Sequence, residues 1–242
     1  MANIIKMQIH MFFYRKSTVA VYFLMYLLVF INFLWNVFEY KGYNYWDMYH
    51  AMKLGFLGDY SPLGFYFMQY YPFIVIIPTA FSYFSDKSNN TVIFIETRSN
   101  RKDYYIGTII AVFVTTFIIF TLPLLVEMGL NYITFPREAV GDQINMNLFN
   151  DIYTEIHYLF HGLWLKNSYL YTFCMNLLFG ITSGILASFT VALSMLNIFK
   201  FKIFMFIPVY SILYSFIALE KISGIEYSAN YFFYLRTFCM EK

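Results

Sequence analysis

Two histidines stand one helical turn apart in the stretch EIHYLFH, which is a spacing used by metal ligands on a helix. His157 and His161 would share one face of that helix, and Glu155 precedes them. Zinc proteases with this spacing carry a glutamate directly after the first histidine, but this chain has Tyr158 there. The pair therefore fits an interfacial helix with polar histidine tips better than a zinc site. We expect no metal and no catalytic residue.

Polar side chains inside apolar stretches are the second set that could do chemistry. Asn32 and Asn36 lie one turn apart in one stretch, and Gln69 and Glu127 lie in two others. An acid within a membrane is costly and often functional, whereas amides there usually form hydrogen bonds between helices. We take these four residues as a candidate cargo path. The alternatives are helix-to-helix hydrogen bonds and, for Glu127, contact with the outer headgroups.

The densest group of basic residues lies in SDKSNNTVIFIETRSNRKDYY, between two long apolar stretches. Cytoplasmic loops of membrane proteins are basic, which explains the sign of the charge. A plain connector needs only a few residues, however, and residues 85–103 contain an apolar core, Val92–Ile95, preceded by helix-capping residues. We expect a short cytoplasmic helix that docks into a groove on a soluble partner.

Composition and hydropathy predict the elements that position these residues. The 242 residues are 60% hydrophobic and only 12% charged, against ~25% charged residues in soluble domains. A helical span needs ~20 mostly apolar residues. Five stretches qualify: 17–40, 63–84, 104–130, 168–196 and 203–219. The sequence therefore predicts an all-α polytopic membrane protein with five transmembrane helices, in a single domain over residues 1–242. A sixth span is expected but not evident.

The distribution of Lys and Arg predicts the orientation in the membrane. Nine of the 16 Lys and Arg residues lie in the N-terminal stretch, in 85–103 and in 197–202, so we place these segments in the cytoplasm. Residues 3–16 are amphipathic and predict an interfacial helix. Residues 131–167 would then lie outside, with an amphipathic helix on the outer surface or, alternatively, a packing cap over the spans.

Small residues and prolines indicate how the spans pack and bend. Gly180, Gly184 and Ser188 form a small face that allows close helix approach, which favours packing within the subunit over a dimer seam. Pro72 and Pro78 interrupt the stretch 63–84, where we expect kinks.

The basic segment resembles the cytoplasmic loop of class-two ABC exporter permeases. That family shows an acidic residue after span two, a short coupling helix, then Thr-Arg, a second Arg and a Tyr on entry to span three. The matching positions are Asp86, Thr97, Arg98, Arg101 and either Tyr104 or Tyr105. Many members carry a Lys shortly after the Tyr, where this chain has Gly107 and Thr108, and the family has six spans.

The resemblance implies a half-transporter in a bacterial cell membrane, with a second permease subunit and a separate ATP-binding cassette ATPase. ATP and Mg would bind in that partner, since this chain lacks a GxxxxGK[ST] phosphate loop. Membrane-active peptides would be the cargo, as in staphylococcal peptide-toxin exporters. The residues coupling to the ATPase would be Val92, Ile93, Phe94, Ile95, Glu96, Arg98 and Arg101.

Two other classes stay open, and one is excluded. A membrane sensor or accessory subunit would share the coupling-like loop without ATP-linked transport. An intramembrane peptide-processing enzyme would need paired acids, a Ser–His pair or a metal set within the spans. A nucleic-acid partner is excluded, because the net charge is only +2 and no basic stripe is present.

Overall fold

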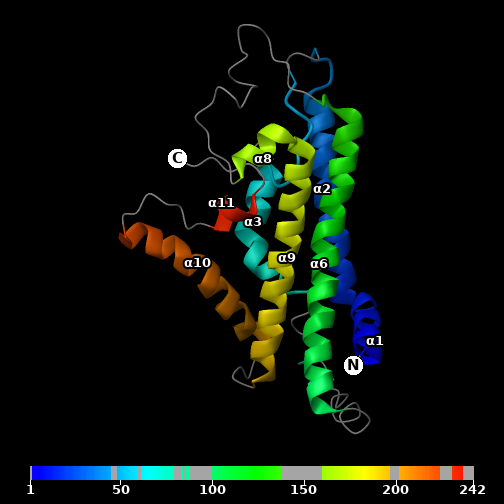
Figure 1. Cartoon of the computed structure of the whole chain (residues 1–242), viewed down its shortest axis with the longest axis vertical. Helices are drawn as coiled ribbons and strands as arrows, with labels where there is room; N and C mark the ends of the chain where they lie inside the picture. The colour runs from blue at the N-terminus through cyan, green and yellow to red at the C-terminus, as the bar shows by residue number, and fades with distance from the viewer. Residues whose placement is uncertain are drawn as a thin grey trace. The chain divides into compact units, whose positions relative to one another are not determined.

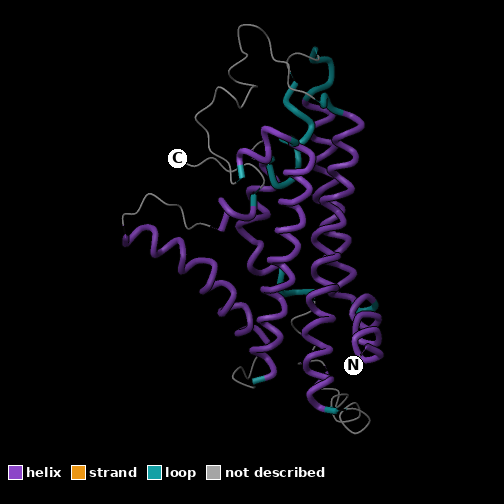
Figure 2. The backbone as a smooth tube through the Cα atoms, viewed as in Figure 1, coloured by secondary structure: helices purple, strands orange, loops and turns teal. Residues whose placement is uncertain are grey.

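The structure is a computed structural model, and each residue it describes lies in a helix, a turn or a loop (Figure 2). It describes residues 2–44, 48–58, 61–78, 83, 86–87, 100–137, 160–196, 202–223 and 231–236. Within these ranges the predicted all-α class is confirmed. The helices, labelled in Figure 1, are α1 (Ala2–Phe13), α2 (Lys16–Glu39), α3 (Pro62–Ile74), α6 (Arg101–Thr134), α8 (His161–Lys166), α9 (Ser168–Met195), α10 (Phe206–Ser223) and α11 (Tyr231–Leu235), with a 3₁₀ turn at Lys202–Met205.

Three of the described helices, α2, α6 and α9, are long and apolar enough to cross a membrane. They correspond to the predicted spans 17–40, 104–130 and 168–196, and their ends differ from the predictions by at most four residues. Each arises from a long apolar run with few charges, which must be buried in lipid or in protein. The chain therefore has the character of a helical membrane protein.

The prediction of five clear spans is supported for three of them only, because the stretches 63–84 and 203–219 are not among the described helices that are long and apolar enough to cross a membrane. Helix α3 has only 13 residues, contains Pro72, and gives way to turns over residues 75–78. Proline lacks the N–H that a continuing helix would use, so Pro72 and Pro78 weaken this helix. Helix α10 has 18 residues, Phe206–Ser223, and the structure describes its side chains only as far as Ser215, so the span predicted at 203–219 stays a prediction.

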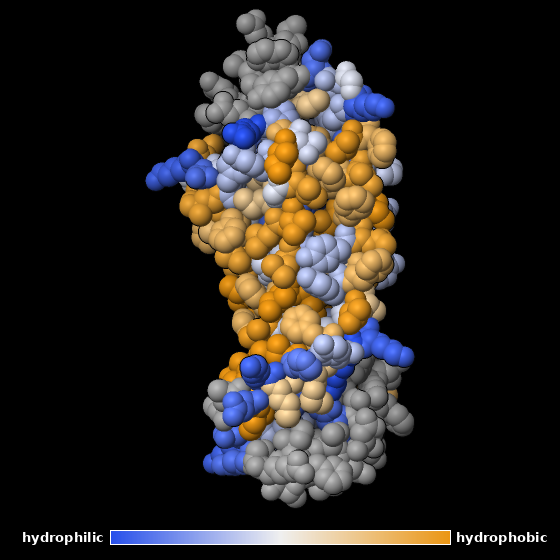
Figure 3. Space-filling view, turned by 90° about the vertical axis from the view of Figure 1, so that its right-hand side faces the viewer, coloured by the Kyte–Doolittle hydropathy of each residue, from blue (hydrophilic) through white to orange (hydrophobic). Residues whose placement is uncertain are grey.

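Large apolar side chains remain exposed along α2. They include Phe23, Phe30, Trp35 and Phe38, each more than half exposed. Figure 3 shows apolar side chains, in orange, spread over much of the visible face. Exposed apolar area of this extent is rare on soluble monomers, and lipid contact explains it.

Contacts divide the chain into two compact units. Unit 1 comprises Met1–Met25, Tyr70–Phe120 and Gly180–Ser215, and unit 2 comprises Tyr26–Gln69, Thr121–Phe179 and Phe216–Lys242. The prediction of one membrane domain over 1–242 stays a prediction.

Unit 1 is held together by close helix contacts on α6. A Cβ added to Gly184 of α9 would lie 2.7 Å from Phe113 Cδ2, and the Ser188 hydroxyl donates to the Ile109 carbonyl at 3.2 Å. The small face of α9 thus packs within the chain at these two positions, as predicted. On another face, Gly107 of α6 receives Ile4 of α1, because a Cβ there would lie 3.1 Å from Ile4 Cγ2.

Unit 2 has a core in which the loop after α2 packs on the ends of α6, α8 and α9. Ala51, Met52, Leu54, Phe135, Trp164, Tyr171 and Met175 are its buried members. The backbone of this loop is tied to the end of α6 by Ala51 N–H, which donates to the Pro136 carbonyl at 2.9 Å. This loop therefore sits firmly against the helices, and it supplies backbone groups to the polar site described below.

Candidate functional site

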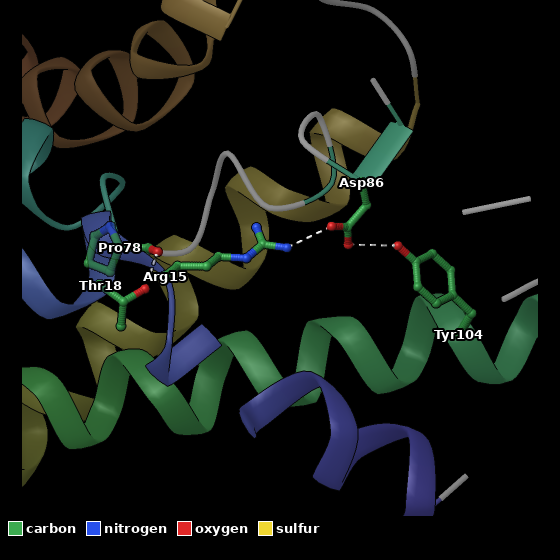
Figure 4. Close-up of polar contacts among 5 residues, drawn as sticks. All are labelled: Arg15, Thr18, Pro78, Asp86 and Tyr104. Carbon is green, nitrogen blue, oxygen red and sulfur yellow. Dashed lines mark hydrogen bonds and ion pairs between the residues drawn. The ribbon is translucent and has the colours of Figure 1, made fainter. Parts of the chain in front are cut away.

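Asp86 forms the first polar cluster, in unit 1, just after the segment that follows α3 (Figure 4). Arg15, between α1 and α2, makes an ion pair with it, with Arg15 NH2 2.7 Å from Asp86 Oδ1. The Tyr104 hydroxyl, in the first turn of α6, donates to Asp86 Oδ2 at 3.3 Å. Figure 4 shows the arginine and the tyrosine approaching the carboxylate from opposite sides. One side chain therefore joins three segments that are distant in the sequence, and we call this cluster the Asp86 brace.

Burial governs the electrostatics of the brace. Asp86 is only 3% exposed, and this loss of solvation raises the pKa of its carboxyl above the ordinary value of 3.8. The Arg15 charge and the hydrogen bonds from Arg15 and Tyr104 oppose the rise but do not cancel it. The brace is thus a partly dry ion pair, in which removing one partner leaves the other charge poorly solvated.

A second contact supports the same junction. The Thr18 hydroxyl in the first turn of α2 donates to the carbonyl of Pro78 at 2.8 Å (Figure 4). Thr18 itself is fully buried. The start of α2 therefore holds the chain at Pro78 and again at Asp86, on the two sides of residues 79–85.

Glu127 of α6 is the centre of the second polar cluster, in unit 2. Its Oε1 accepts from Asn32 Nδ2 at 2.7 Å, and its Oε2 accepts from the backbone N–H of Phe56 at 2.9 Å. Glu127 is 2% exposed. Within the part of the chain that the structure describes, no basic side chain pairs with it. A buried carboxylate is thus stabilised by neutral donors.

The hydrogen bonds around Asn32 extend this cluster to α3. Ser61 Oγ donates to Asn32 Oδ1 at 2.7 Å and accepts from the Gly64 N–H at 2.9 Å. Ser61 precedes Pro62 at the start of α3, so it is the N-cap of that helix, and proline in the first helical position is favoured. Asn36 Nδ2 donates to the Leu54 carbonyl at 2.8 Å. We call Gly64, Ser61, Asn32, Glu127 and Phe56 the Glu127 network.

The structure brings together three of the four residues of the candidate cargo path. Asn32, Asn36 and Glu127 are all buried in unit 2 and converge on the loop after α2, whereas Gln69 is exposed and takes no part. The alternative of helix-to-helix hydrogen bonds fits Asn32, which donates to Glu127 of α6, whereas Asn36 donates to a loop carbonyl. For Glu127, the sequence suggested headgroup contact, but its carboxylate faces the protein interior.

The coupling residues lie largely outside the described residues. Val92, Ile93, Phe94, Ile95, Glu96 and Arg98 belong to that undescribed stretch, and Arg101 is described only as the first residue of α6. His157 and most of the predicted outer helix also lie outside the described residues. His161 is described only as the start of α8. The coupling helix and the outer helix therefore stay predictions.

A Ser–His pair that the sequence did not suggest lies in unit 2. His50 Nε2 is 3.0 Å from Ser168 Oγ, and His50 Nδ1 accepts from the Met52 N–H at 3.0 Å. A neutral imidazole that accepts at Nδ1 carries its proton on Nε2. The histidine is then a donor to the serine, and it is in the wrong tautomer to take the serine's proton. The pair holds the loop after α2 against α9 and is not arranged as a nucleophile with its base.

Ser61, Arg15 and Asn131 are site residues that the sequence did not single out. The Ser-Pro pair ahead of an apolar stretch is a helix-start signal that would have marked Ser61.

No protein-family model, curated protein or solved structure matches this chain.

Proposed function

We propose that this chain is the membrane-spanning permease subunit of an ATP-driven exporter in a bacterial cell membrane. It acts with a second permease subunit and a separate ATPase subunit, and its N-terminus is cytoplasmic. Residues 85–103 receive the motion of the ATPase. The cargo is a hydrophobic or amphipathic molecule, and membrane-active peptides are the class that we assign.

The Asp86 brace is the observation that carries this proposal. Asp86 and Tyr104 are two of the positions that match the permease loop pattern, and here they bond to each other at 3.3 Å. Arg15 attaches the same carboxylate to the start of α2 at 2.7 Å. Both α2 and α6 are long enough to span a membrane. A movement of the segment 85–103 would therefore reach both helices through one side chain.

The proposal is tested by isolating the tagged full chain in detergent from its own cells and assaying ATP hydrolysis. The wild-type chain should bring with it a subunit that carries a GxxxxGK[ST] motif. The double variant Glu96→Ala with Arg98→Ala should lose that subunit, because it alters the docking segment. Asp86→Asn should retain the subunit but lose most of the ATPase stimulation, because the brace no longer transmits motion.

Glu39→Gln is the matched control, because it makes the same carboxylate-to-amide change at an exposed position of α2. It should leave both the bound subunit and its activity unchanged. Recovery of the chain without an ATPase in every preparation would assign it to the sensor or accessory class. Full activity in Asp86→Asn would show that the brace does not couple the subunits.

A further inference from the structure

A small cavity in unit 2 lies beside the Glu127 network and takes no part in the proposed coupling. Its polar lining comes from Glu127, Asn131, Thr172 and Asn176, and its apolar lining includes Met52 and Leu124. It has room for about one water-sized group. A space this small and this polar suits a single ion or water molecule.

The charge of Glu127 is not balanced by the hydrogen bonds it accepts. Phe56 N–H can only donate, and Asn32 must present its NH2 to Glu127 because its carbonyl oxygen accepts from Ser61. Both carboxylate oxygens therefore accept hydrogen bonds, an arrangement that suits an ionised carboxylate. A buried charge without an opposite charge is costly, and the apolar walls of the cavity increase that cost.

Asn131 provides a second and independent sign of a ligand. It lies one helical turn beyond Glu127 on α6, is 1% exposed, and lines the same cavity. Neither its amide oxygen nor its amide nitrogen has a hydrogen-bond partner among the described residues. Buried amides are rarely left unpaired, so a group in the cavity is needed to satisfy it.

We propose that this cavity binds one small monovalent cation, for which Na⁺ is the probe. The cation is held by the Glu127 carboxylate and by the Asn131 amide oxygen. Thr172 Oγ1 adds a third oxygen, since its hydrogen is donated to the Ser168 carbonyl at 3.0 Å and its lone pairs are left for a cation. Hard cations are bound by such oxygen ligands. The inference does not depend on the proposed export function.

The test is the thermal unfolding of the purified full chain in detergent, followed by tryptophan fluorescence at fixed neutral pH. NaCl is compared with choline chloride at equal ionic strength. Binding to the folded state alone should raise Tm in proportion to the logarithm of Na⁺ concentration above its Kd. Isothermal titration with NaCl should give one site per chain.

Asn131→Leu is the decisive variant, because it removes two unpartnered polar atoms and keeps a similar volume. If Asn131 were only structural, the variant would be as stable as the wild type or more stable and would keep any Na⁺ response. If Asn131 is a cation ligand, Asn131→Leu should abolish the Na⁺-dependent rise in Tm. Glu127→Gln should abolish the rise as well, and Glu39→Gln, at an exposed carboxylate of α2, should preserve it.

Two results would overturn the proposal. The first is an equal Tm in NaCl and choline chloride, including the case in which Tm responds only to pH and the carboxyl is neutralised by a proton. The second is a full Na⁺ response in Asn131→Leu. Because the Asn131 side chain makes no hydrogen bond to the described residues, Asn131→Leu keeps the test valid even if Glu127→Gln fails to fold.

Discussion

Replacing Asn32 by Leu is the sharpest test of the Glu127 network. The two side chains have similar volume, so the change removes hydrogen bonds without opening a large cavity. Asn32 is 2% exposed and donates to Glu127 Oε1 at 2.7 Å. It also accepts from Ser61 Oγ at 2.7 Å. The variant leaves the hydrogen of the buried Ser61 hydroxyl without its acceptor and one oxygen of the buried Glu127 carboxylate without its donor.

The expected loss of stability follows from these two bonds. A hydrogen bond between membrane helices is worth ~0.6 kcal/mol on average, and one to a charged group can reach ~3 kcal/mol. Losing these two bonds, together with the longer 3.3 Å bond to the Leu54 carbonyl that Asn36 still serves, gives a cost of about 1 to 5 kcal/mol. Asn36→Leu is the matched control one turn along α2. It loses a single 2.8 Å bond to the Leu54 carbonyl, which Asn32 still serves at 3.3 Å, so its cost should be below ~1 kcal/mol.

The assay is unfolding of both variants and the wild type by SDS titration in a mild detergent, followed by tryptophan fluorescence. The midpoint and slope give the free energy of unfolding for each protein. Adding Ser61→Ala to Asn32→Leu should cost less than Ser61→Ala does in the wild type, since the bond between them is already lost. The reasoning is refuted if Asn32→Leu costs no more than Asn36→Leu.

Three further changes test other contacts. Gly184→Ala should destabilise the chain by about 1–3 kcal/mol in thermal unfolding, because its Cβ would lie 2.7 Å from the Phe113 ring and 3.1 Å from the Phe113 carbonyl oxygen; Gly129→Ala, which enters open space, should cost nothing. Ser61→Ala should cost about 0.5–2 kcal/mol as a lost N-cap, measured by the same SDS titration. The raised pKa of Asp86 means that the folded state favours its protonated form, so the stability of the wild type should fall as pH rises above about 3.8. A series of thermal melts at different pH values should show a smaller fall for Asp86→Asn.

The spans that the sequence predicted well are those in which apolar composition alone decides the structure. Helices α2, α6 and α9 follow unbroken apolar runs, so hydropathy located them to within a few residues. The stretch 63–84 is also mostly apolar, but Pro72 and Pro78 withdraw two backbone donors and α3 ends at Ile74. A hydropathy average does not register that loss, because proline removes a backbone hydrogen bond from the helix without making the stretch much less apolar.

The candidate site was predictable in its residues but not in its assembly. Asn32, Asn36 and Glu127 stood out because amides and acids are costly in apolar segments. Their meeting point is the backbone of the loop after α2, where Leu54 and Phe56 supply a carbonyl and an N–H. Every residue type except proline carries both of those backbone groups, so no pattern of side chains in the sequence could reveal them.

The fixed direction of the Glu127 network has a consequence for proton movement. A hydrogen-bonded chain relays a proton only if every group in it can reverse from donor to acceptor. This network begins at the Gly64 N–H and ends at the Phe56 N–H, and it passes through the Asn32 amide. Neither a backbone N–H nor an amide NH2 gives up its hydrogen at neutral pH or accepts another. The network therefore insulates Glu127 on the side of α2 and α3, and among the described residues the cavity beside Asn131 is the route left open to a proton.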